Sequence, residues 1–291
     1  MLSCLRLLTA VASLTVIAGP AFAQKADRPT PPRIEVDPAA LDRDTITIGG
    51  GVGLVPSYDG SNDYVVIPAA AVRGRVNGIN FSSRGLQLSA DLIRDKSMAS
   101  WDLMLGPVVS LNLNRTARIV DARVLALGRR RAAFEVGGYV GIGKTGVITS
   151  PYDRLSVRVN YVRDVTGVHN SYVLTPVIDY GTPISRSAYV GIGGSATIVG
   201  DSYAETYFAV DAAGAARSGL PLFARPRGGV KNYTANLLFN YALSGDLQHG
   251  LQLFTLVSYS RLQGDFARSP LTSVAGNPNQ VYSAIGLGYT F

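Results

Sequence analysis

The last residues of the chain, Val281–Phe291, read VYSAIGLGYTF, and their alternation decides the fold. Every second residue forms a face that is mostly apolar and ends in an aromatic side chain: Val281, Ser283, Ile285, Leu287, Tyr289 and Phe291. Most of the residues between them are small or polar: Ala284, Gly286, Gly288 and Thr290. Successive side chains of a β-strand point to opposite faces, so this pattern predicts a strand with one apolar and one polar face.

The same alternation recurs in other segments. In residues 232–243 the apolar face holds Tyr233, Ala235, Leu237, Phe239, Tyr241 and Leu243, and the polar face holds Asn232, Thr234, Asn236 and Asn240. Strands of soluble sandwiches usually have about five or six residues, whereas a tilted strand needs about ten to cross a bilayer. The alternation therefore predicts an all-β fold, a transmembrane antiparallel β-barrel, whose interior holds Asp102, Glu135, Arg158 and Asn236.

The ending of this strand is the most specific signal in the sequence. Tyr289 followed by a terminal Phe291 resembles the signal that the outer-membrane assembly machinery recognises. A buried edge strand of a soluble protein is the alternative, but such strands seldom alternate up to their last residue. We therefore predict that Tyr289 and Phe291 form an assembly signal.

Composition excludes several other classes. The 291 residues are 47% hydrophobic and 16% charged, which excludes a disordered chain. No apolar run long enough for a membrane helix follows residue 23. The formal charge of +7 is more typical of a generally solvated basic surface than of a binding site, and the partners it would otherwise suggest are anionic lipid head groups, lipopolysaccharide or peptidoglycan. No nucleic-acid-binding motif is present.

The N-terminal region predicts export. Residues 1–23 have Arg6, a short apolar core and an Ala-x-Ala site, as in a signal peptide cleaved after Ala23. Residues 24–44 are Pro-rich and predict a periplasmic leader, and residues 45–291 predict the barrel. The chain's one cysteine, Cys4, lies in the signal peptide, so the mature chain has no disulfide and no thiolate. The expected location is the bacterial cell outer membrane.

We expect about twelve strands, with ten as the alternative. The segments lie near 45–54, 64–74, 78–93, 101–113, 131–143, 155–165, 170–180, 187–200, 203–210, 231–242, 250–262 and 281–291. An even count puts both chain ends in the periplasm. Parity then gives periplasmic turns near 75–77, 166–169, 201–202 and 244–249, together with the long stretch 114–130. The segments expected to face outward lie near 55–63, 144–154, 211–230 and 263–280.

The sequence gives little support for an enzyme. A barrel hydrolase needs a serine, a histidine and an orienting group within hydrogen-bond reach. The only histidines, His169 and His249, fall at predicted periplasmic turns, the wrong rim for an enzyme acting on the outer leaflet. We therefore predict no enzyme activity, no catalytic residue, no cofactor and no metal site.

Several motifs in order resemble the MipA/OmpV family of outer-membrane proteins, named in part for an MltA-interacting protein. They are 56–64 (PSYDGSNDY), 82–86 (SSRGL), 201–208 (DSYAETYF), 217–221 (RSGLP), 264–271 (GDFARSPL) and 288–291 (GYTF). The resemblance implies a scaffold linking a murein hydrolase, the lytic transglycosylase MltA, with a murein synthase at the periplasmic face. The alternatives are a small-solute channel or a surface adhesin, and thirdly a lipid-modifying barrel enzyme.

A cluster of arginines is the candidate partner-binding surface. Its members are Arg115, Arg118, Arg123, Arg129, Arg130 and Arg131. Asp121 is the only acidic residue between the first and the last of these arginines. Such a patch attracts acidic partners or peptidoglycan through steering that weakens with salt. A clamp for phospholipid head groups is the alternative. The expected partners are outer-membrane lipid and lipopolysaccharide, the barrel assembly machinery, and the two murein enzymes.

Overall fold

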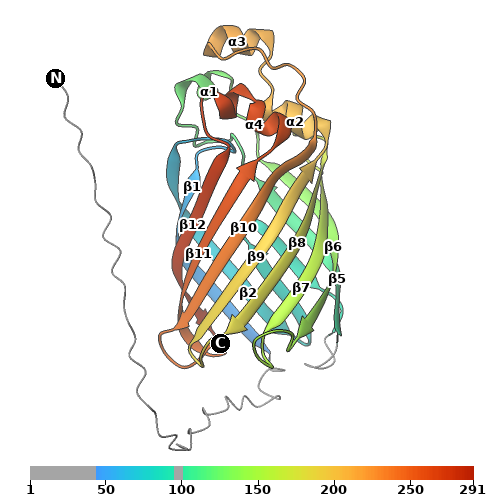
Figure 1. The fold of residues 1–291 in the computed structure, drawn as a ribbon, viewed down its shortest axis with the longest axis vertical. Helices are drawn as coiled ribbons and strands as arrows, with labels where there is room; N and C mark the ends of the chain where they lie inside the picture. Colours follow the sequence, from blue (N-terminus) through green and yellow to red (C-terminus); the bar gives the residue numbers. More distant parts are fainter. Residues whose placement is uncertain (1–43, 95–100) are drawn as a thin grey trace, which may run out of the picture. The chain divides into compact units, whose positions relative to one another are not determined.

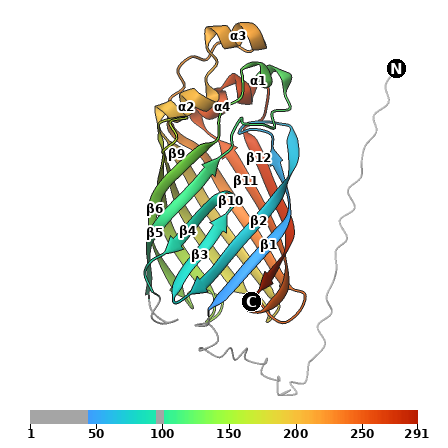
Figure 2. The ribbon, with the colours of Figure 1, turned by 180° about the vertical axis from the view of Figure 1, so that it is seen from behind.

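The computed structural model describes residues 44–94 and 101–291, and within them twelve antiparallel strands close into a barrel (Figures 1 and 2). The predicted fold class and strand number are therefore confirmed. The predicted signal peptide, and the leader up to residue 43, lie outside the described residues.

The strands are β1 (Thr45–Pro56), β2 (Tyr64–Val76), β3 (Ile79–Arg84), β4 (Gln87–Asp91), β5 (Trp101–Asn112), β6 (Ala133–Thr145), β7 (Arg154–Asp164), β8 (Tyr172–Pro183), β9 (Ala188–Val199), β10 (Gly229–Ala242), β11 (Gly250–Leu262) and β12 (Asn279–Thr290). The helices are α1 (Ala122–Ala126), α2 (Asp201–Phe208), α3 (Ala212–Ser218), α4 (Gly264–Arg268) and α5 (Pro270–Ser273). None of the helices in these ranges is long and apolar enough to span a membrane.

The strands divide into an outer apolar face and an inner polar face, as the alternation predicts. In β10, Leu237 is 49% exposed on the outside and is paired with Ile192 and Val257. Its neighbour Asn236 lies on the inner face, opposite Gly193 and Ser258. In β12, Ile285, Leu287 and Tyr289 are likewise exposed on the outside. An apolar outer surface is the one that lipid requires.

Aromatic side chains gather at both ends of this outer surface. Near one end the exposed rings are Tyr64, Phe134, Tyr161, Tyr172, Tyr233 and Tyr259. Near the other end they are Trp101, Phe239, Tyr241, Tyr289 and Phe291. Aromatic girdles of this kind mark the two membrane interfaces of transmembrane barrels, so the strands span the bilayer between them.

The two ends of the barrel differ. β1 begins and β12 ends at one end, which we call the terminal end (Figure 1). All the helices named above lie at the opposite end, which we call the cap end. The segments that cover the cap end, residues 57–63, 113–132, 200–228 and 263–278, form what we call the helical cap.

Two predicted strands are wrong. Residues 78–93 are not one strand but the hairpin β3–β4, because Gly85 takes a φ of +57° and turns the chain at mid-segment. Residues 203–210 are not a strand, because residues 201–208 form α2. One extra strand and one missing strand cancel, which is why the predicted number is still right.

The same two errors reverse the predicted sides of everything between them. Segments 114–130, 166–169 and 201–202 lie at the cap end, away from the chain ends, not with them as predicted. Segment 144–154 lies at the terminal end rather than outward. Segments before 78 precede both errors, and segments after 210 follow the second error, which cancels the first, so both sets keep their predicted sides.

The barrel closes along a seam between β1 and β12 that is lined with glycine. On the inner face Gly49 lies opposite Gly288, and Gly51 lies opposite Gly286. A Cβ atom added at Gly51 would lie 2.2 Å from the carbonyl oxygen of Ile285, so the two strands approach more closely than any other residue allows.

Candidate functional site

The outer layer of the helical cap is a small hydrophobic core of its own. It contains Tyr58, Ile119, Val124, Leu127, Val210, Leu220, Leu271 and Ala275, each at most 9% exposed. The Tyr58 hydroxyl donates to the carbonyl oxygens of Leu271 and Ala275, at 3.1 and 2.9 Å. Burial raises the pKa of the Tyr58 hydroxyl, which keeps it a neutral donor. Four separate segments of chain are thereby joined into one unit.

The inner layer of the helical cap fills the barrel below this core. α2 begins with Asp201 in its first turn, where a carboxylate suits the helix dipole, and it buries Tyr203, Ala204, Tyr207 and Phe208. The Phe208 ring meets the Phe266 ring of α4 edge to face, with centroids 5.1 Å apart. Val199 and Leu262 supply the adjoining barrel wall. The lumen is therefore packed with side chains at the cap end.

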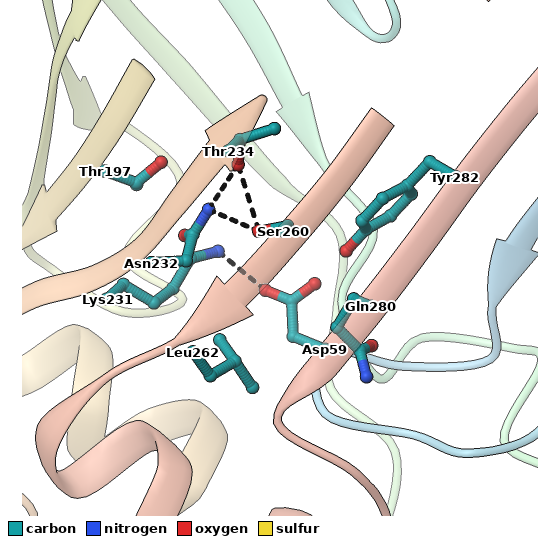
Figure 3. Close-up of a pocket in the computed structure, with 9 residues that line it drawn as sticks. All are labelled: Asp59, Thr197, Lys231, Asn232, Thr234, Ser260, Leu262, Gln280 and Tyr282. Atoms are coloured by element: carbon teal, nitrogen blue, oxygen red, sulfur yellow. Dashed lines mark hydrogen bonds and ion pairs between the residues drawn. The ribbon is translucent and has the colours of Figure 1, made fainter. Parts of the chain in front are cut away.

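An ion pair connects the helical cap to the wall (Figure 3). The Lys231 ammonium lies 2.7 Å from Asp59 Oδ2, and 3.4 Å from the hydroxyl of Tyr203 on α2. Lys231 occupies a β-bulge between Val230 and Asn232, and the extra residue aims its side chain inward. The pair borders a polar cavity of about 120 Å³. We call this ion pair of Lys231 and Asp59 the latch. Strand alternation does not predict it, because the bulge interrupts the two-residue alternation of inward and outward side chains.

His169 is buried, and both nitrogens of its ring form hydrogen bonds. Its Nδ1 accepts the backbone N–H of Ser171 at 3.2 Å, so Nε2 carries the proton and donates to Glu135 Oε1 at 3.1 Å. Both side chains are at most 4% exposed. Since Nδ1 is occupied by an amide, it is not available to take a proton from the Ser171 hydroxyl. His169 lies at the cap end, not on the side of the chain ends as predicted, whereas His249 lies at the terminal end, on the predicted side.

The predicted arginine cluster is divided by the structure. Arg115 is 1% exposed and donates to the carbonyl oxygens of Tyr207 and Gly128, at 3.0 and 3.1 Å. Burial, together with the charge of the neighbouring Arg130, lowers its pKa to about 10. Arg130 donates to Thr206 O at 2.8 Å. These two arginines therefore hold the helical cap together.

The other members of the cluster are exposed: Arg118, Arg123, Arg129 and Arg131. Arg123 pairs with Asp121 at 2.7 Å, and Arg131 donates to Thr166 O at 3.2 Å. All of them belong to the 113–132 segment of the helical cap. Their predicted place beside the chain ends is wrong, because the β3–β4 hairpin adds one strand before this segment and so puts it at the other end of the barrel.

The lumen is open at the terminal end. A cavity of about 490 Å³ there is lined by residues of β1 to β7 and β12, among them Arg73, Arg75, Arg154, Arg158 and Asp91. Met104 and Tyr139, which line it, belong to a buried cluster with Val108 and Val162 on the adjacent strands β5, β6 and β7. Sequence alternation predicts Arg158 as an interior residue but does not show that four arginines share one cavity, because that depends on the register of distant strands.

No group of three or more histidine, cysteine, aspartate or glutamate side chains that could hold a metal ion occurs within residues 44–94 and 101–291.

Comparison with solved structures gives only distant likenesses. An outer-membrane channel from Pseudomonas putida F1 is 13% identical, with a TM-score of 0.43 over 85% of this chain and 95% of that chain. OmpT of Vibrio cholerae is 7% identical, with a TM-score of 0.34 over 85% and 98%. The toluene transporter TodX from Pseudomonas putida is 10% identical, with a TM-score of 0.33 over 87% and 91%. At these scores nothing about function follows.

Comparison by sequence is more informative. No curated protein sequence matches the chain. The family described as "MltA-interacting protein MipA" matches residues 48–291, which is nearly the whole barrel from β1 to the end of the chain. The matched range includes all the motifs quoted in the sequence analysis. The resemblance to this family, predicted from those motifs, is therefore confirmed. The chain is an outer-membrane β-barrel that belongs to the family of the MltA-interacting protein MipA.

Proposed function

We propose that this chain is a non-enzymatic outer-membrane scaffold that binds a murein hydrolase of the MltA type, and through it a murein synthase, at the periplasmic face. The observation that carries the proposal is membership, over residues 48–291, of a family named for its interaction with MltA. Export with cleavage after Ala23 belongs to the same proposal, and it predicts that the mature protein begins at Gln24 in mass spectrometry of its N-terminal peptide.

The orientation of the barrel follows from its loops. Bacterial barrels have short periplasmic turns and longer extracellular loops. The long helix-bearing segments are at the cap end, whereas turns such as 77–78 and 184–187 are at the terminal end. We therefore assign the terminal end to the periplasm, where a murein enzyme is found.

The terminal end offers an apolar contact surface. Leu92, Ile148 and Ile184 are 61%, 67% and 60% exposed, and they lie beyond the ends of the strands. Their turns follow β4, β6 and β8, which makes them consecutive along this rim. We call these three residues the apolar rim. We infer that these three side chains, on neighbouring turns, form one contact surface, since contiguous exposed apolar patches mark protein interaction sites.

The alternatives are less well supported. A small-solute channel needs an open lumen, but α2 and α4 fill it with side chains at the cap end. A lipid-modifying enzyme needs an accessible histidine near the outer leaflet, but His169 is buried and satisfied by Glu135 and Ser171.

The exposed arginines remain a proposed contact surface, on the opposite face from the apolar rim. A partner of Arg118, Arg123 and Arg129 would approach from outside the cell, as the ligand of a surface adhesin would. Changing these three arginines to glutamate is expected to abolish the salt-sensitive binding of this partner. Heat-modifiable gel migration, a sign of an intact barrel, should be unchanged. Labelling of this surface on intact cells by an impermeant reagent checks its side.

The scaffold is tested with detergent-solubilised protein and a purified MltA-type hydrolase in a surface-binding assay. Ile148→Asp combined with Ile184→Asp is expected to weaken binding at least tenfold. The matched control is Val165→Asp combined with Leu222→Asp, since both residues are 61% exposed but lie at the cap end. No binding of the hydrolase to the unaltered protein would refute the scaffold, and equal losses in both double variants would refute the apolar rim.

A further inference from the structure

The cavity at the terminal end carries an excess of positive charge. Of the side chains that line it, four are arginines and one is a carboxylate, that of Asp91. Asp91 is 4% exposed, and its Oδ1 already accepts the backbone N–H groups of Ile93 and Leu105, both at 3.1 Å. Asp91 is thus held by the chain's own backbone, and its single negative charge is less than the four positive charges of the arginines.

Two of the arginines have no acidic partner within the described part of the chain. Arg154 is paired with Asp102, and the nearby Arg84 is paired with Asp179 at 2.7 Å. Arg73 and Arg158 form no ion pair with any residue in 44–94 or 101–291. Arg158 is only 8% exposed, its guanidinium lies 5.8 Å from the centre of the Tyr139 ring, and its Nε has no hydrogen-bond partner. Buried charges are normally paired. The carboxylate that acts on Arg158, that of Asp179, is in direct contact with Arg84 instead.

These two guanidinium groups approach the cavity from different walls. Arg73 is on β2 and Arg158 is on β7, which lie five strands apart along the described wall. The hydroxyl and amide groups of Ser82, Ser89 and Asn80 line the same space. A planar guanidinium fork matches the oxygens of a carboxylate or a phosphate. A volume of about 490 Å³ is within the range of small-molecule sites.

We propose that this cavity is a binding site for a small multivalent oxyanion, a molecule with two or more phosphate or carboxylate groups. The ligand enters through the terminal end and spans the lumen between Arg73 and Arg158. Met104 and Tyr139 line the same cavity deeper in the lumen. The site is independent of the apolar rim and of any murein partner.

Isothermal titration calorimetry of the full chain in detergent tests this with two probes, pyrophosphate and citrate, at matched ionic strength. We expect saturable binding at one site per chain for at least one probe, weakening as sodium chloride is raised. Binding of pyrophosphate alone assigns phosphate groups, and binding of citrate alone assigns carboxylates. Absence of saturable binding for both probes would overturn the proposal.

Variants separate the site from general charge effects. Arg73→Gln and Arg158→Gln are each expected to weaken binding at least tenfold, and Arg158→Lys less than Arg158→Gln, because it keeps the charge but loses the fork. The matched control is Arg163→Gln, which removes an exposed arginine from the outward face of the same strand, β7. An equal loss in the control would overturn the proposal.

A measurement on the unaltered protein covers the case in which these variants fail to fold. Phenylglyoxal modifies accessible arginines, and modified peptides are counted by mass spectrometry. A saturating amount of the bound anion is expected to slow modification of Arg73 and Arg158 severalfold while Arg163 is modified at an unchanged rate. Equal rates with and without the anion at Arg73 and Arg158 would contradict the proposed site.

Discussion

Removing the ammonium of the latch by Lys231→Met should loosen the helical cap. The change leaves Asp59 as a carboxylate that is 23% exposed, with its partner at 2.7 Å gone. Breaking a buried pair by removing one partner costs about 3–5 kcal/mol. Because Asp59 keeps some contact with solvent and borders a polar cavity, the lower end applies, about 3 kcal/mol. That free energy corresponds to an increase of about 100-fold in the population with an open cap.

Two assays measure this effect. Urea unfolding in lipid vesicles is expected to give a free energy of unfolding about 3 kcal/mol lower for Lys231→Met. In planar bilayers, where we expect the unaltered protein to conduct little, this variant should show frequent openings. The double variant Asp59→Asn with Lys231→Met should recover most of the loss, because no unpaired charge is left in the protein.

The control is another ion pair of the helical cap. Arg268 pairs with Asp265, but its side chain is 72% exposed. Exposed pairs contribute less than about 1 kcal/mol, so Arg268→Met should leave both readouts nearly unchanged. If Lys231→Met has the stability and conductance of the unaltered protein, or if the double variant is as unstable as the sum of its two single variants, the latch does not hold the cap.

Three further predictions test other parts of the molecule. Leu237→Arg puts a charge in mid-strand on the lipid face and should lower the free energy of unfolding in urea by about 2–4 kcal/mol, whereas Asn236→Arg points into the lumen and should cost far less. Deleting Phe291 removes its 2.9 Å backbone bond to β1 and should reduce outer-membrane yield and abolish heat-modifiable migration on gels. Asp153 accepts N–H groups of its own loop, and these bonds outweigh burial and hold the pKa of the carboxyl below its ordinary value. The loop is therefore stabilised above about pH 4 and loses this stabilisation as the pH falls. Amide hydrogen exchange of residues 147–150 at pH 6 and pH 2 would detect the loss. Equal protection of these amides at the two pH values would count against the role of Asp153.

Strand alternation predicts most of the barrel because the membrane enforces it. A wall strand has lipid on one side and a polar lumen on the other, so apolar and polar residues must alternate along it, as Leu237 and Asn236 do in β10. The helical cap has no such constraint. In α2 the buried residues Tyr203, Ala204, Tyr207 and Phe208 repeat at a spacing of four, the period of a helix, and a search for period two mistakes them for a strand.

Sites depend on contacts that alternation does not determine. Asp59 and Lys231 are separated by 172 positions, and a bulge directs the lysine. Arg73 and Arg158 share a cavity only because β2 and β7 face one lumen. The predicted side of each connection depends on every turn before it. Because alternation gives no signal for the turn at Gly85, the arginine cluster is predicted at the wrong end of the barrel.

The seam between β1 and β12 also has a kinetic consequence. Every other pairing in the described wall joins strands that follow one another in the chain, so the paired residues are much closer in sequence than those of the seam. The seam joins residues as far apart as Thr47 and Thr290, 243 positions along the chain. Closing so long a loop costs about 3 kcal/mol more in chain entropy than closing a hairpin of about ten residues. The glycines facing one another there add no side-chain contact to offset that cost. Registration of the first strand against the last should therefore be the slow step of folding, and the open-edged sheet that precedes it is the species most exposed to aggregation.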